Sequence, residues 1–227
     1  AFSSATPSPD PGPVVELNGV DLQRFRFKIT FPGWSAEVSD LAIKGKLKVP
    51  EGDTAVEGVL YNARATAGSG TLTIAGQAIP IKAVSVTRCE VTSADPMSWW
   101  VDTTMMAAGA PVHASGRMTN TFREGTGVQL AVSSKEATAL LKHLVGQRIS
   151  GKVQVVGRLD GLLDGPLISG NVRGVQADLG PAGLATELKG ALDLDLGKGT
   201  FTAKKVSGKA LGGGLKASGR MELESGD

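Results

Sequence analysis

Residues 25–49 read FRFKITFPGWSAEVSDLAIKGKLKV, and this stretch decides the fold class. Before Pro32 the apolar side chains fall on every second residue, with basic or hydroxyl side chains between them. After Gly33 the same alternation resumes at Trp34. A period of two residues puts the apolar side chains on one face of a β-strand and the polar ones on the other. The stretch therefore predicts two antiparallel strands joined by a Pro-Gly turn.

The alternation continues along most of the chain. It predicts further strands near 56–65, 70–76, 78–92, 97–107, 111–121 and 127–133, and it resumes from Ile149 to Glu224. Gly68-Ser69-Gly70 and Ala75-Gly76-Gln77 are typical of tight turns. Strands that follow one another at such spacing pair most simply as an antiparallel meander.

One segment, residues 134–145, has a different period. Its apolar residues fall at 137, 140, 141, 144 and 145, which is the stripe of an amphipathic helix. Ser133 and Glu136 stand at capping-box spacing, and Gly146 suits a left-handed residue after the last turn. We expect one short α-helix here that plugs an open end or edge of the β structure.

The composition favours a bent sheet with small side chains. Of the 227 residues 31 are Gly, about twice the usual share of about 7%, and only 4% are aromatic. Glycines inside strands, such as Gly45, Gly58 and Gly219, let a sheet bend. The apolar faces fit either a sandwich core of two sheets or the lining of one sheet that curls without closing.

These observations predict a mostly β fold, a long antiparallel curled sheet (a β-taco or groove) with the one helix. We divide the chain into a flexible lead-in (1–13), an N-terminal β-strand region (14–132) and a helix-plus-strand region (133–227) continuous with the preceding sheet. The opening residues AFSSATPSPDPGP begin without Met and lack the apolar core of a signal peptide, which suggests a fragment or a processed form.

The sequence offers little chemistry. The formal net charge of +2 provides no field that would attract nucleic acid. Motifs such as GxSxG, HExxH, Walker A and CxxC are absent from the sequence. His113, His143 and the lone Cys89 are interpreted as structural, and Asp160 with Asp164 as turn residues. We therefore expect no enzyme activity, no cofactor and no metal site.

The apolar faces are the candidate functional surface, because acyl chains are apolar, flexible and tolerant of shape. The residues expected to line a lipid groove are Phe25, Phe27, Ile29, Leu41, Ile43, Leu47, Val153, Val155, Leu192, Leu194, Leu196, Leu215 and Met221.

Residues 133–224 carry a family resemblance. The helix ending in Leu144-Val145-Gly146 is followed by Ile149-Ser150-Gly151, by GRLDGLLDGPLISGNV at 157–172 and by GGGLKASGRMEL at 212–223. This series resembles the C-terminal region of the AsmA-like / TamB family of bridge-like lipid-transfer proteins. Residues 14–49 are similar to the upstream strands of that family in style only.

The resemblance implies a periplasmic segment whose hydrophobic β-groove shields phospholipid acyl chains between the inner and outer membranes. It also implies a parent protein anchored in the inner membrane, with a BamA-like outer-membrane barrel as a partner. Two alternatives stay open at this point: a module that assists outer-membrane protein assembly by binding at strand edges, and a structural β-sandwich.

Overall fold

The computed structural model describes residues 15–49, 59–92, 95–119 and 125–223. Within these ranges the chain forms thirteen β-strands, one α-helix and one 3-10 turn. The strands are β1 (Val15–Thr30), β2 (Trp34–Val49), β3 (Val59–Ile74), β4 (Gln77–Thr92), β5 (Asp95–Ala107), β6 (Ala110–Thr119), β7 (Gly127–Ser134), β8 (Ile149–Ser150), β9 (Gln154–Leu162), β10 (Leu167–Asp178), β11 (Leu184–Asp195), β12 (Thr200–Ala210) and β13 (Gly213–Glu222). Helix α1 is Thr138–Val145, and the 3-10 turn η1 is Gly180–Ala182.

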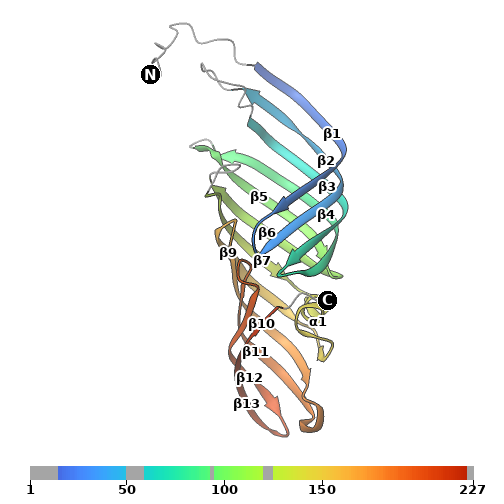
Figure 1. Cartoon of the computed structure of the whole chain (residues 1–227), viewed down its shortest axis with the longest axis vertical. Helices are drawn as coiled ribbons and strands as arrows, with labels where there is room; N and C mark the ends of the chain where they lie inside the picture. The colour runs from blue at the N-terminus through green and yellow to red at the C-terminus, as the bar shows by residue number, and fades with distance from the viewer. Residues whose placement is uncertain (1–14, 50–58, 93–94, 120–124, 224–227) are drawn as a thin grey trace.

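The described strands belong to one sheet that is not closed. The pairing follows the chain from β1 to β7, continues from β9 to β13, and is antiparallel throughout, with β8 pairing on β10. This confirms the mostly β class, the single antiparallel meander and the one short helix. The structural β-sandwich is wrong, because the apolar faces belong to one sheet and not to two stacked ones. Figure 1 shows that this sheet curls as it descends from β1 to β13.

Helix α1 begins later than the sequence predicted. It starts at Thr138, and its N-cap Ala137 makes no side-chain capping bond, so the Ser133–Glu136 capping box is wrong. Ser133 and Ser134 are instead the last residues of β7. Gly146 has φ 113° and ψ 165°, a positive φ outside the left-handed helical region that was predicted.

The hairpin turns use left-handed residues. Ala75 (φ 47°) and Gly76 (φ 84°) join β3 to β4, which confirms that predicted turn. Leu211 (φ 50°) and Gly212 (φ 76°) join β12 to β13 in the same way. Two consecutive positive φ angles match the twist of the flanking strands. The other predicted turn, Gly68-Ser69-Gly70, is wrong: it lies inside β3, so the strands near 56–65 and 70–76 are one.

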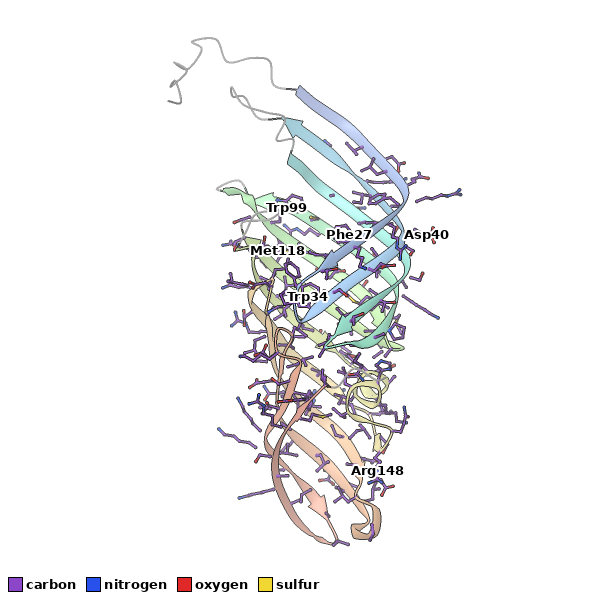
Figure 2. All side chains as sticks on the ribbon, viewed as in Figure 1. Phe27, Trp34, Asp40, Trp99, Met118 and Arg148 are labelled. Carbon is purple, nitrogen blue, oxygen red and sulfur yellow. The ribbon has the colours of Figure 1, made fainter. Side chains whose placement is uncertain are left out.

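The sheet bends where its register shifts, and left-handed residues sit at these bulges. They form two groups: Arg24, Asp40 and Ala83 lie in β1, β2 and β4, and Gly174, Glu187 and Lys205 lie in the neighbouring strands β10, β11 and β12. Bulges increase local twist and bend a strand. Figure 2 shows Asp40 at the corner where β2 changes direction.

Two of the three glycines predicted to bend the sheet lie at register shifts. Gly45 and Gly219 lie next to register shifts, at β2–β3 and at β12–β13. Gly58 is outside the described residues. Five of the six left-handed bulge residues named above carry a side chain, so these bulges do not depend on glycine.

The two halves of the sheet meet at their hairpin turns. The Trp34 indole N–H donates to the Leu163 carbonyl at 2.9 Å, which ties β2 to the β9–β10 turn. Gly33 lies so close to the carbonyls of Leu196 and Gly197 that a Cβ would have no room. We call this contact between the β1–β2 turn and the β9–β10 and β11–β12 turns the seam. It brings together segments more than a hundred residues apart without pairing strands.

Candidate functional site

One face of the sheet carries a continuous apolar row across all twelve main strands. Directly opposed residues of antiparallel strands share a face, so the register can be followed from strand to strand. The row, which we call the central row, consists of Leu22, Ile43, Ala65, Val86, Thr103, Ala114, Val132, Gly157, Gly170, Leu192, Ala203 and Gly219. It contains no charged residue. We call its face the inner face.

The opposite, outer face carries cross-strand ion pairs. Lys44 lies 3.4 Å from Asp21, directly beside the Ile43–Leu22 pair of the central row but on the other face. Lys204 hydrogen bonds to Asp193 and holds the pKa of that carboxyl below its usual range. These charges lie in water, where such pairs contribute little stability. The asymmetry between the faces therefore separates a wet outer surface from an apolar inner one.

The inner face is only partly covered. Leu22 is 49% exposed and Phe27 is 43% exposed. Phe27 is opposite Val38, which packs against the core at the seam, so Phe27 belongs to the inner face. Figure 2 places Phe27, Trp34, Trp99 and Met118 within the curl and not along its outside. An apolar face left open to water in this way usually marks a binding surface.

At the level of the seam, the inner face forms a partly open cavity of about 310 Å³. Strands β2–β7 and β9–β12 and helix α1 all contribute to its lining. Apart from the hydroxyls of Thr103, Ser133 and Ser134, the lining side chains are hydrocarbon, aromatic or thioether groups. Pockets with this composition bind apolar ligands.

Helix α1 closes one side of this cavity. Leu140, Leu141 and Leu144 are its lining residues from the helix. Thr138 Oγ1 donates to the Gly151 carbonyl at 2.6 Å, which fixes the first turn beside β8. At the other end the Gln77 side-chain amide donates to the His143 carbonyl at 2.7 Å. The helix thus bridges β4 of the N-terminal half and the segment preceding β9, which agrees with the expected plug.

The close glycine pair in the central row deepens the inner face. Gly157 and Gly170 are opposite each other on β9 and β10. A Cβ built on Gly157 would lie 2.8 Å from the Gly170 Cα, and the reverse distance is 2.9 Å. No real side chain tolerates such contacts, so only glycine allows the two backbones to curl this tightly.

Most of the predicted lining residues lie on the inner face. Val155, Leu192, Leu194 and Leu196 line the cavity. Ile43 is in the central row, and Leu41 is opposite Phe25 next to the bulge at Asp40. Ile29 is opposite Ala36, two residues along β2 from the cavity residue Trp34.

The other four predicted lining residues lie near the ends of strands. Val153 is fully buried in a cluster with Ala137 and Leu141, so it packs beneath α1. Leu215 contacts the edge of that cluster, and Met221, which is opposite the cavity residue Phe201, is on the inner face but is exposed. Leu47 lies in β2 opposite Leu17, and its side chain is outside the described part of the chain.

The sequence interpretation missed the middle of the lining. The residues concerned are Trp34, Leu72, Ile74, Ile79, Met105, Val112, Ala114, Leu130, Val132, Leu159, Ile168 and Phe201. Alternation was visible in most of these strands. In β5, however, the pairs Trp99-Trp100 and Met105-Met106 place apolar residues on both faces. The sequence of this strand therefore does not show which of its faces is the inner one.

The titratable residues singled out from the sequence make ordinary structural contacts. His113 Nε2 lies 3.1 Å from Asp102 Oδ1, and His143 Nε2 lies 2.7 Å from the Ala78 carbonyl. Asp160 is in strand β9 with Arg158 at 3.5 Å, so its assignment to a turn is wrong, whereas Asp164 is in the β9–β10 turn. Among the described residues no group of three or more His, Cys, Asp or Glu could hold a metal ion. Within the same ranges no helix has the length and hydropathy needed to cross a membrane.

Cys89 gives the inner face a natural reporter. It is opposite Val101 and Ala63, and each of these lies two positions along its strand from a central-row residue, Thr103 and Ala65 respectively. Burial, followed by the nearby Glu90 carboxylate, raises the pKa of the thiol from 9.0 to about 11. Only the thiolate reacts with alkylating reagents.

We therefore expect Cys89 to react with iodoacetamide at pH 8 about 100-fold more slowly in the folded protein than in denaturant, since a shift of two pKa units lowers the thiolate fraction by that factor. The rate should rise about tenfold per pH unit up to pH 11. Mass spectrometry of quenched samples measures it. Equal rates in the folded and denatured protein would contradict the placement of Cys89 on a covered face.

Comparison of the chain with protein-family models, with curated proteins and with solved structures gives no match.

Proposed function

We propose that the chain is a non-enzymatic lipid-transfer segment whose inner face shields acyl chains. The observation that carries the proposal is the central row: twelve strands of an open sheet present an uninterrupted uncharged surface, with Leu22 and Phe27 still exposed. A ligand that covers such a face must be apolar, elongated and adaptable, and acyl chains meet all three conditions. The resemblance of residues 133–224 to the AsmA-like / TamB family agrees with this function.

The same resemblance supports a setting for the proposal. The segment would lie in the periplasm of an envelope with two membranes and would pass phospholipid between them. The parent chain would be anchored in the inner membrane, with a BamA-like barrel as an outer-membrane partner. The wet outer face, with its ion pairs, suits a structure that crosses an aqueous space.

Lipid extraction followed by mass spectrometry tests the proposal directly. The purified chain is expected to carry acyl lipid, and a photoreactive amino acid at Phe27 should crosslink to it. The matched control is the same amino acid at Trp100, which is 39% exposed but lies on the outer face opposite Arg117. Absence of lipid, or equal labelling from both positions, would refute the proposal.

A second candidate function is client binding by strand addition. Among the described strands β1 pairs only with β2 and β13 only with β12, so each presents a free backbone edge. An extended segment of another protein could add to either edge. This function needs the edges and not the inner face. A charged substitution on the inner face should therefore abolish lipid binding and leave client binding unchanged, which distinguishes the two functions.

A further inference from the structure

Two hydroxyl groups in the cavity have no hydrogen-bond partner among the described residues. Ser134 is 7% exposed, and its Oγ accepts or donates no hydrogen bond. The Oγ1 atom of Thr103 is equally buried and equally without a partner. Both residues line the cavity beneath α1. A buried polar atom left unsatisfied destabilises a fold and calls for an explanation.

The positions of these two hydroxyls would suit hydrocarbon side chains. Thr103 is the one polar member of the central row, between Val86 and Ala114, where valine would have the same shape. Ser134 is the last residue of β7, opposite Val155, just before the chain turns into α1. Hydrocarbon side chains at both sites would remove the unsatisfied groups. The hydroxyls therefore fit the ligand better than they fit the empty cavity.

The chemistry of the lining selects the ligand group. A serine or threonine hydroxyl donates one hydrogen bond, and a carbonyl oxygen is its usual acceptor. None of the described residues that line the cavity carries a charge, so a phosphate or carboxylate buried against them would lack a counterion and would be strongly disfavoured. The ligand group is therefore neutral, and its surroundings are apolar on both sides.

We infer that Thr103 and Ser134 each offer a hydrogen bond to an ester carbonyl of an acyl lipid in this cavity, so that the site prefers ester-linked to ether-linked chains. The inference rests on the proposed function. The hydrocarbon of the ligand lies along Leu192, Leu194 and α1, and any charged headgroup stays outside the cavity.

The test compares two uncharged probes, methyl myristate and myristyl methyl ether, which differ only in the carbonyl. Calorimetric titration of the whole chain is expected to show the ester binding about fivefold more tightly, since a net neutral hydrogen bond is worth about a factor of five and a single carbonyl accepts from one hydroxyl at a time. The double variant Thr103→Val/Ser134→Ala should lower affinity for the ester about fivefold and leave the ether unchanged. It should keep or raise the melting temperature of the ligand-free protein.

Thr104→Val is the matched control, because Thr104 follows Thr103 on β5 but is exposed on the outer face. It should bind both probes as the native chain does. Equal affinity of the native chain for the two probes overturns the inference, as does an equal loss for both probes in the double variant, which would mark a structural role or hydroxyls satisfied by water. If native lipid co-purifies in those cases, the proposed function stands alone. If neither probe binds and no lipid co-purifies, both fail.

Discussion

The Ile43→Asp variant is expected to lose acyl-chain binding almost completely. Ile43 lies between Leu22 and Ala65 in the central row, in the part of the inner face that is open to ligand. A carboxylate there must either be buried against hydrocarbon, which costs several kcal/mol, or keep its water and hold the lipid away. We expect the bound lipid recovered by extraction to fall by at least about tenfold, which corresponds to about 1.4 kcal/mol.

The matched control is Ala42→Asp, the same charge change one residue earlier. Ala42 is opposite Thr66 on the outer face, so its carboxylate would point to water. This variant should bind lipid as the native chain does, and thermal melting of both variants checks folding. If both bind lipid normally, the inner face is not the ligand surface. If Ile43→Asp loses lipid but still binds an unfolded outer-membrane protein, the chain has both functions.

The Trp34→Ala variant is expected to lose about 3 kcal/mol of unfolding free energy, the usual cost of removing a large aromatic side chain from a core. Trp34 packs against the cluster of Ile74, Ile79 and Leu194 at the seam, and its ring lies 5.0 Å from that of Phe31. Its indole N–H also donates to the Leu163 carbonyl. Removing it opens the seam and leaves that carbonyl without its donor.

Trp100→Ala is the comparison for this effect. Trp100 is exposed on the outer face, and the Arg88 guanidinium lies 5.9 Å from the centre of its ring. A cation–π contact in water contributes about 0.5–1 kcal/mol, so we expect a loss below about 1 kcal/mol. Urea denaturation followed by circular dichroism measures both losses. Similar losses for the two variants would show that the seam does not hold the halves together.

Local pattern was sufficient for the class of fold and for much of the inner face. Alternation at 25–49 and 149–224 placed Ile43, Leu192 and Leu194 correctly, because the period of two is a property of each strand alone. The bulges left a trace as well: Val38 and Leu41 are three residues apart, so the apolar phase slips where Asp40 is inserted. Where both faces of a strand carry apolar residues, as at Trp99-Trp100, the local pattern does not show which residues point to the inner face.

The depth and the closure of the groove were not predictable in this way. Gly33 and Gly197 meet only because twist accumulates over the eight strand pairings from β2 to β11, and no residue near either glycine encodes that sum. The unsatisfied hydroxyls of Thr103 and Ser134 are likewise ordinary strand residues until β5, β7 and α1 surround them.

The sequence by itself determined one long antiparallel sheet with an apolar face, a wet face and a short amphipathic helix, since each follows from the spacing of neighbouring side chains. Tertiary structure alone decided that the sheet bends at bulges, that its hairpin turns meet at the seam, and that α1 covers a cavity there. The physical reason is the number of residues over which each effect acts. Alternation acts over two residues, whereas curl and enclosure arise from twist and register shifts added across the whole sheet.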